Sequence, residues 1–171
     1  METFYARGSY YYVADNIAPD ILCTAAEIGV ADTSNVKTWV GRPNNRNKYI
    51  NFKEIVLVDN TSNPMYISCI NDFVAKNQIA RFVNKPSVEA ASKFPDEYFD
   101  FIYIDAAHYY KDVVSDLDAW QYKIKKHGFI CGHDYDVDQN FDVNRAINEF
   151  AEARNAKVIK MHTEFAMRRS W

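Results

Sequence analysis

The residues with the greatest capacity for chemistry lie in two short segments, each at the end of an apolar run. Asp105 ends one run and is followed three residues later by His108. His133 and Asp134 directly follow the next run. If these runs are neighbouring parallel strands, two carboxylates and two imidazoles meet in one crevice, because open α/β sheets bind ligands beyond the carboxyl ends of their strands. The sequence therefore predicts a polar site at these strand ends.

Several chemical interpretations of this set are open. Carboxylate oxygens with an imidazole can hold a divalent cation such as Mg²⁺, which lowers the pKa of a bound substrate hydroxyl. Alternatively, His108 or His133 acts as the general base, since an imidazole pKa of ~6.5 suits proton abstraction near neutrality. The same side chains would also suit a hydrolase that activates water on a metal. The remaining interpretation is a hydrogen-bonded network that only closes the loop ends.

Other strand ends carry residues suited to binding a nucleotide-like cofactor. Gly29 would let the backbone approach such a cofactor, and Glu27 can accept a hydrogen bond from an ammonium group. Gly29 could equally be a simple turn residue. Asp59 can accept hydrogen bonds from ribose hydroxyls, although an Asp at a strand end is also a common cap or turn former. Ser87 either caps a short helix or touches a purine.

The elements that must position these residues alternate between strand-like and helix-like patterns, which predicts parallel βαβ units. The strand candidates are short, apolar and bounded by polar residues, as expected for strands buried on both faces. They are Ala25–Val30, Glu54–Asp59, Ile79–Asn84, Phe99–Asp105 and Gly128–Gly132. Near the C-terminus, Lys157–His162 and Phe165–Trp171 are predicted to form an antiparallel edge pair joined at Thr163 and Glu164.

Helices are predicted from apolar residues at three- and four-residue spacing. One buried stripe consists of Tyr109, Val113, Leu117, Trp120 and Ile124. A second helix has Asp142 as its predicted N-cap, with an inner face of Val143, Ala146, Ile147 and Phe150. A short helix is expected over Ser34–Val40. The Pro- and Asn-rich stretch Gly41–Lys53 that follows has no apolar period and is predicted to be a long exposed loop.

Length and charge limit the class of protein. The 171 residues, of which 48% are hydrophobic, suit a single domain over residues 1–171. A net charge of -3 with scattered Lys and Arg indicates neither nucleic-acid binding nor a polybasic membrane anchor. The three cysteines lie in separate apolar runs, which is typical of buried thiols in a reducing compartment. We therefore expect a cytoplasmic protein with a small-molecule partner; a homo-oligomer is compatible with the sequence.

The segment FDFIYIDAAHYYKDVVSDLDAWQYKIKKHGFICGHDYD closely resembles the core of class I S-adenosylmethionine-dependent methyltransferases. It is most similar to the branch of macrocin-type and sugar O-methyltransferases. Three further segments, AAEIGV, IVLVDN and ARFVNKPSVEAASKF, match the family's first, second and third cofactor motifs in order. The resemblance implies an α/β, Rossmann-like three-layer sandwich with a mostly parallel seven-stranded sheet and an antiparallel C-terminal strand.

The resemblance also implies roles for individual residues. By position, Glu27 and Gly29 contact the amino-acid part of S-adenosylmethionine, and Asp59 binds its ribose. Ser87 then lies near the adenine, and Asp105 borders the cofactor. These roles are carried over from the family's motifs onto the matching positions of this chain.

A metal site is implied as well, with one departure from the family's pattern. Metal-dependent relatives hold Mg²⁺ with an Asp after the fourth strand and an Asp-Asp or Asp-Asn pair after the fifth. Here these positions are Asp105 and the pair His133 and Asp134. Because Mg²⁺ prefers oxygen ligands, the histidine favours a softer ion or a metal-independent reaction.

The expected function is therefore S-adenosylmethionine-dependent methylation of a small hydroxylated acceptor such as a sugar. Asp105, His108 and His133 are the catalytic candidates. A second departure supports an alternative: the family usually has another glycine four residues after Gly29, where this chain has Thr33. Its side chain is expected to narrow the cofactor cleft or displace the loop. The alternative is a degenerate, non-catalytic binding protein with the same fold.

Overall fold

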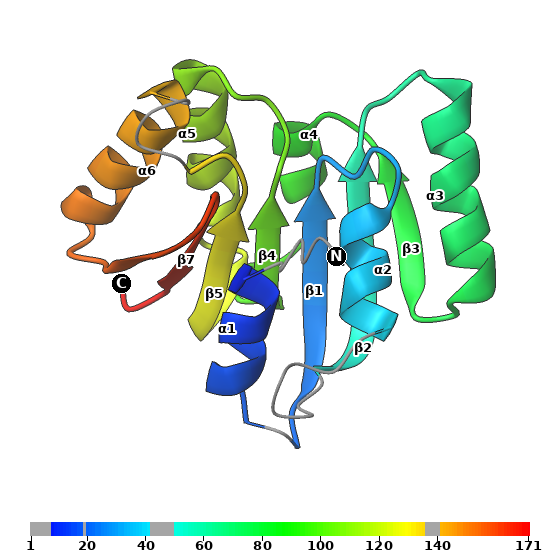
Figure 1. Ribbon diagram of the computed structural model, residues 1–171, viewed down its shortest axis with the longest axis horizontal. Helices are drawn as coiled ribbons and strands as arrows, with labels where there is room; N and C mark the ends of the chain where they lie inside the picture. Colours follow the sequence, from blue (N-terminus) through cyan, green and yellow to red (C-terminus); the bar gives the residue numbers. More distant parts are fainter. Residues whose placement is uncertain (1–7, 19, 42–49, 136–140) are drawn as a thin grey trace, which may run out of the picture.

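The protein forms one mixed sheet covered by helices on both faces (Figure 1). The computed structural model describes residues 8–18, 20–41, 50–135 and 141–171. The strands are β1 Leu22–Ile28, β2 Asn51–Asp59, β3 Ala80–Asn84, β4 Phe99–Ile104, β5 Ile124–Gly132, β6 Val158–Met161 and β7 Glu164–Arg168. The helices are α1 Gly8–Asn16, α2 Ser34–Gly41, α3 Pro64–Lys76, α4 Ser87–Ala91, α5 Tyr110–Trp120 and α6 Phe141–Ala153.

The strand order is β3-β2-β1-β4-β5-β7-β6. β1 to β5 pair in parallel, and β7 runs antiparallel to both β5 and β6. This confirms the predicted α/β Rossmann-like fold with its seven-stranded, mostly parallel sheet. The order reverses between β1 and β4, the kind of position where open α/β sheets bind ligands.

The register brings the carboxyl ends of the central strands to one level. Ile28 of β1 pairs with Val58 of β2 and Ile104 of β4, and Ile104 pairs with Gly132 of β5. Residues that follow these strands therefore meet above one edge of the sheet. This register positions the candidate site residues.

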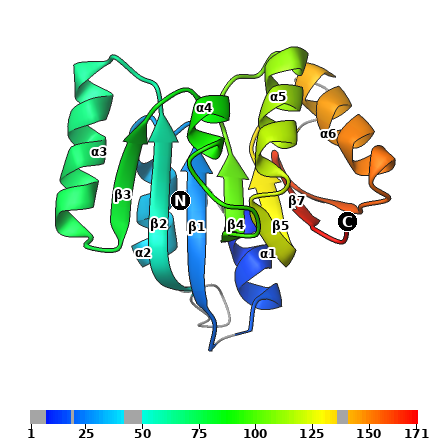
Figure 2. The same ribbon diagram turned by 180° about the vertical axis from the view of Figure 1, so that it is seen from behind.

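Two cores flank the sheet because its strands are apolar on both faces. Within β2, Val56 and Val58 pack with the helices α4, α5 and α6, whereas Ile55 and Leu57 pack with α1, α2 and α3. Figure 2, seen from behind, shows α4 and α5 in front of the sheet with α1 and α2 beyond it. The three layers predicted from the sequence are thus present.

Two helix predictions need correction. Ile124 belongs to the start of β5 rather than to the helix before it, because α5 ends at Trp120. Asp142 does not cap its own helix but lies in the first turn of α6. Its Oδ2 instead accepts a hydrogen bond from the backbone N–H of Tyr110, 3.2 Å away at the start of α5. Asp142 therefore caps the neighbouring helix.

Segment boundaries differ from prediction at two loops. The predicted loop Gly41–Lys53 lies partly outside the described residues, at 42–49. Its last residues, Asn51–Lys53, form the start of β2, where Asn51 and Phe52 pair with β1. Glu164, predicted as part of a turn, is the first residue of β7.

Helices α1 and α3 were not predicted, although the sequence at the start of α3 is typical of a helix N-terminus. Asn63 caps α3 by accepting the backbone N–H of Met65 at 3.0 Å, and Pro64 follows at the first helical position, a typical helix start. α1 has only a weak apolar period in its tyrosine-rich sequence. None of the described helices is long and apolar enough to cross a membrane.

Candidate cofactor and active site

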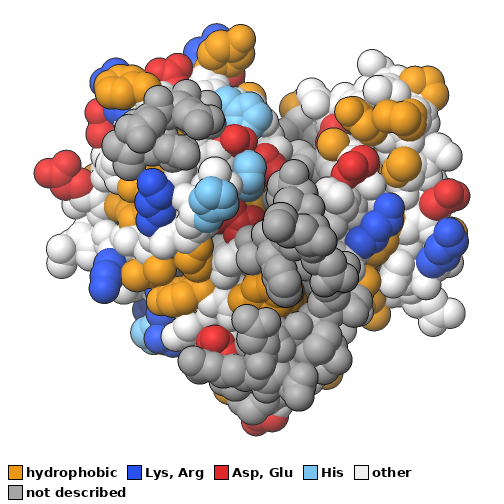
Figure 3. All heavy atoms as spheres, viewed as in Figure 1, with side chains coloured by type: hydrophobic (Ala, Val, Ile, Leu, Met, Phe, Trp, Pro, Cys, Tyr) orange, Lys and Arg blue, Asp and Glu red, His pale blue; other side chains and the backbone are white. Residues whose placement is uncertain are grey.

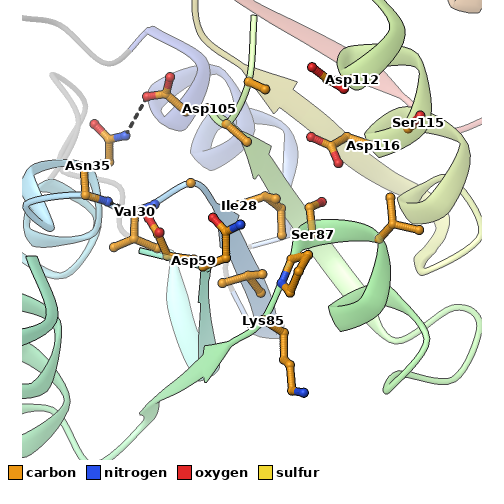
Figure 4. A pocket seen from close by; sticks show the side chains of 18 of the residues that line it. Ile28, Val30, Asn35, Asp59, Lys85, Ser87, Asp105, Asp112, Ser115 and Asp116 are labelled. Carbon is orange, nitrogen blue, oxygen red and sulfur yellow. Dashed lines mark hydrogen bonds between the residues drawn. The ribbon is translucent and has the colours of Figure 1, made fainter. Parts of the chain in front are cut away.

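A cavity of about 590 Å³ opens at the carboxyl ends of the parallel strands. Its walls come from the loops after β1, β2, β3 and β4 and from one face of α5 (Figure 4). Four of the predicted cofactor residues line it: Gly29, Asp59, Ser87 and Asp105. Figure 3 shows histidine and acidic side chains gathered beside a hollow on one face of the molecule.

Gly29 is required by the close approach of two strand ends. It has φ 85°, and a Cβ at this position would lie 2.2 Å from the carbonyl oxygen of Asp105. The backbone N–H of Asp105 donates to the carbonyl of Ile28 at 2.8 Å, which holds the two ends together. A side chain at Gly29 would therefore separate β1 from β4 as well as being strained.

Asp59 fixes the loop between β1 and α2. Its Oδ2 accepts the backbone N–H groups of Val30 and Ala31 at 2.8 and 3.1 Å. Its Oδ1 accepts the N–H of Thr61 at 2.7 Å. Each carboxylate oxygen has more than one lone pair, so Asp59 can still accept a ribose hydroxyl while it holds the loop. The cap and ribose interpretations are compatible.

Glu27 lies behind the cavity wall rather than in it. It is fully buried, and its Oε1 accepts a hydrogen bond from Asn35 Nδ2 at 2.6 Å. Asn35 Nδ2 also lies 3.3 Å from Asp105 Oδ2. Asn35 lines the cavity and joins α2 to the ends of β1 and β4. Asn35 could not be singled out from the sequence, because only the tertiary structure brings this helical residue to the two acids.

Thr33 does not narrow the cleft, contrary to expectation. Its side chain is fully buried, and it is not among the residues that line the cavity, although Asp32 and Ser34 are. Its hydroxyl donates to the carbonyl of Asp32. Thr33 has φ 68°, a conformation that usually favours glycine. Thr33 thus adopts a backbone conformation that glycine reaches easily, while its side chain is buried outside the cavity lining.

The second cluster lies beside the cavity, beyond Asp105. His108 Nε2 is 2.7 Å from Asp134 Oδ2 and 3.9 Å from Asp105 Oδ1. His133 Nδ1 contacts the same Asp134 oxygen at 3.2 Å, and its Nε2 lies 3.1 Å from the hydroxyl of Thr163. The predicted pairs therefore meet, with Asp134 between the two imidazoles.

The electrostatics of this cluster favour an ion pair between His133 and Asp134. Hydrogen bonding to Asp134 raises the pKa of His133, and the charge of Asp105 adds to this while burial opposes it. Hydrogen bonding to His133 lowers the pKa of Asp134 against the effect of burial, and the charge of His133 lowers it further. Asp134 has φ 60°, an unusual backbone conformation for a residue other than glycine. In this conformation its Oδ2 contacts both His108 and His133.

The residues that could hold a cation differ from the predicted set. Asp105, His108 and Asp134 each offer one ligand atom within 4.8 Å of the others. His133 already contacts Asp134 and Thr163 through its two ring nitrogens. Two carboxylates and one imidazole suit a first-row divalent ion such as Mn²⁺ better than Mg²⁺, which prefers oxygen ligands alone.

At the far end of the cavity, Ser87 takes part in a hydrogen-bonded chain. Its Oγ accepts the indole N–H of Trp120 at 2.9 Å, and its hydroxyl is hydrogen-bonded to Asp116. Asp116 is 6% exposed and lines the cavity together with Asp112. Neither carboxylate was singled out from the sequence, because both lie on a helix whose apolar stripe dominates the pattern.

The fold agrees with that of known methyltransferases. A family model described as a methyltransferase domain matches residues 35–135. No curated protein sequence matches the chain. The chain belongs to this family of class I S-adenosylmethionine-dependent methyltransferase domains.

Solved structures with the same fold include several methyltransferases. A precorrin-6y C5,15-methyltransferase from Geobacter metallireducens has a TM-score of 0.64 at 17% identity, covering 94% of this chain and 88% of that one. The TDP-rhamnose 3′-O-methyltransferase of calicheamicin biosynthesis has a TM-score of 0.65 at 15% identity, with coverages of 96% and 77%. The 1,6-didemethyltoxoflavin-N1-methyltransferase of Burkholderia thailandensis, with S-adenosylhomocysteine bound, has a TM-score of 0.67 at 10% identity, with coverages of 96% and 78%.

Proposed function

We propose that this protein is an S-adenosylmethionine-dependent methyltransferase that acts on a hydroxyl group of a small acceptor such as a sugar. The observation that carries the proposal is the position of Asp105. It lines the large cavity and also lies 3.9 Å from His108 in the cluster. A cofactor cavity and a proton-accepting cluster thus share one wall. The TDP-rhamnose 3′-O-methyltransferase and its similar fold support a sugar as the acceptor class.

The cavity residues suit S-adenosylmethionine, which supplies an electrophilic methyl group when bound. Asp59 would accept the ribose hydroxyls, and Asn35 and Asp105 would face the amino-acid part. Ser87 would lie near the adenine. Binding in this cleft would contribute to the rate by orientation, because positioning two reactants removes much of the entropic barrier.

His108 is the proposed general base. If its Nε2 carries the proton donated to Asp134, the Nδ1 lone pair is left to accept a proton from the acceptor hydroxyl. The acceptor oxygen gains the methyl group as it loses this proton, so His108 ends the step as imidazolium. Asp134 and Asp105 stabilise that charge. His133 acts through Asp134 as a positioning residue.

A bound cation would give His108 a different role. If Asp105, His108 and Asp134 hold a divalent ion, Nε2 is a ligand and the ion itself acidifies the acceptor hydroxyl. Titration with MnCl₂ and MgCl₂, followed by calorimetry, separates these roles. Saturable Mn²⁺ binding that is lost in Asp134→Asn favours the metal role. Absence of heat with both ions favours His108 as the base.

The experiment that tests the proposed function is calorimetric titration with S-adenosylhomocysteine. We expect saturable binding to the wild type and at least about 10-fold weaker binding to Ala107→Tyr, which places a ring in the cavity wall. Ala153→Tyr, at an exposed position of α6, is the matched control and should bind like the wild type. No heat with the wild type at millimolar ligand would overturn the proposal.

The same titration tests the alternative of a degenerate binding protein. That alternative rested on Thr33, whose side chain faces away from the cavity. We expect Thr33→Gly to change the affinity for S-adenosylhomocysteine less than about 2-fold, or about 0.4 kcal/mol, because residue 33 does not line the cavity. Binding that appears only in Thr33→Gly would favour the degenerate protein.

A further inference from the structure

The wall of the cavity formed by α5 presents polar groups of one kind. Asp112, Ser115 and Asp116 all line the cavity from this helix. The hydroxyl of Ser115 donates to the backbone carbonyl of Lys111 at 2.8 Å, so its proton is already used. Its remaining lone pairs and the two carboxylates can only accept hydrogen bonds. A ligand group that forms a hydrogen bond with one of these atoms therefore has to be the donor.

Ser87 orients Asp116, the most buried of these three acceptors, through a hydrogen bond. Because the Oγ of Ser87 accepts the indole N–H of Trp120, its own proton is free to be donated to Asp116. Trp120 and Asp116 are buried, and Ser87 and Asp116 meet at the cavity wall. Figure 4 shows the carboxylate of Asp116 projecting toward the cavity beside Ser87 and Ile28.

Burying a carboxylate such as that of Asp116 is unfavourable unless hydrogen bonds replace those lost to water. Burial raises its pKa, the hydrogen bond from Ser87 lowers it, and the charge of Asp112 raises it further. A carboxylate in this state gains from any additional N–H that a ligand brings, because hydrogen bonds to charged groups are the stronger ones.

We propose that Asp116 is a specificity-determining residue that selects a purine with an exocyclic amino group by accepting a hydrogen bond from that amine. The inference rests on the proposed function, in which Ser87 and its neighbours surround the base of the cofactor. An adenine offers a donor at this position, whereas a hypoxanthine offers a carbonyl oxygen. That oxygen would face the Asp116 carboxylate, which is also an acceptor.

The inference is tested by comparing S-adenosylhomocysteine with S-inosylhomocysteine, which differ only in the purine. For the wild type we expect S-inosylhomocysteine to bind about 10- to 100-fold more weakly, the range of one hydrogen bond to a charged group. In Asp116→Asn the amide can turn either its oxygen or its NH₂ toward the purine. The ratio of the two dissociation constants should then fall to below about 3.

Asp118→Asn is the matched control, because Asp118 lies on the same helix with a 58% exposed side chain and does not line the cavity. Its ratio should equal that of the wild type. Equal affinities of the wild type for the two ligands would overturn the role of Asp116 while leaving the proposed function intact. An unchanged ratio in a folded Asp116→Asn would also overturn it. Failure of both ligands to bind the wild type would remove the proposed function and this inference together.

Discussion

At the scale of single residues, Asp59 and Gly29 stabilise the local structure in addition to their proposed roles in cofactor binding. Asp59 binds three backbone N–H groups of neighbouring loops, and Gly29 permits the contact between β1 and β4. The two interpretations that the sequence left open for these residues are therefore not exclusive. The residues proposed to bind the cofactor therefore also hold the loops and strand ends that form the cavity.

Gly29 provides the sharpest test of this coupling. We expect Gly29→Ala to lower the free energy of unfolding by at least about 2 kcal/mol, because left-handed strain alone costs about 1–2 kcal/mol and the new methyl would overlap the carbonyl of Asp105. Urea denaturation measures this change. Ala31→Gly, in the same loop at φ 48°, should leave stability unchanged or raise it. Equal changes in the free energy of unfolding for the two substitutions would contradict the close approach of residue 29 to the carbonyl of Asp105.

The pair of His133 and Asp134 predicts a pH dependence of stability in the absence of added metal. The pKa of His133 is raised above 6.5, so its contribution is fully present below pH 6.5 and is lost as pH rises through the raised value. The pKa of Asp134 is lowered below 3.8, so its contribution is present above pH 3.8 and is lost as pH falls through the lowered value. The pair therefore stabilises the fold most between these limits.

Urea denaturation as a function of pH checks this sign. The stability advantage of the wild type over His133→Gln should be largest between pH 3.8 and 6.5 and should shrink above that range. His127→Gln, in the amino-terminal half of β5, is the control and should not reproduce this profile. An advantage that grew with pH above 6.5 would show that the pair is not formed.

At the scale of elements, the start of helix α5 depends on a side chain of helix α6. Asp142 of α6 accepts the first backbone N–H of α5, at Tyr110. α5 carries Asp112 and Asp116 into the cavity wall, and its start follows His108. The cap therefore links the position of α6 to both parts of the candidate site.

Removal of this cap should be measurable as a loss of stability. We expect Asp142→Ala to lower the free energy of unfolding by about 1 kcal/mol, the usual value for a lost helix cap. Chemical denaturation followed by circular dichroism measures it. Glu152→Ala, at an exposed position of the same helix, should change stability by less than about 0.5 kcal/mol. Equal losses in both variants would mean that Asp142 does not cap α5.

At the scale of the whole molecule, the cavity draws its walls from both layers of helices. Asn35 reaches it from α2 on one face, and Asp116 reaches it from α5 on the other. A ligand that fills it would bridge elements far apart in the chain. A ligand that binds only the native state stabilises it by an amount that rises with the logarithm of the ratio of ligand concentration to dissociation constant.

This bridging predicts a rise in melting temperature with ligand. At S-adenosylhomocysteine concentrations 100 times the dissociation constant, the free energy of unfolding should rise by about 2.7 kcal/mol. Differential scanning calorimetry with and without ligand measures the shift. With its affinity lowered at least about 10-fold, Ala107→Tyr should show about half of the shift or less, and Ala153→Tyr all of it. A shift of the same size in Ala107→Tyr would place the ligand outside this cavity.

The sequence by itself determined the fold class and the strand-end residues. Strands buried on both faces must be apolar throughout, so β1, β2, β4 and β5 were recognisable from short apolar runs. Parallel strands put their carboxyl ends at one edge, so Asp59, Asp105 and Asp134 could be assigned to one crevice before any contact was known. The expected positions of Gly29 and Ser87 followed from the same rule.

Only the tertiary structure decided which side chains turn toward the site. Side-chain direction depends on packing against distant segments, which local patterns do not encode. This is why Asn35 and Asp116 were missed, why Thr33 turns away from the cavity, and why His108 rather than His133 joins the possible cation ligands.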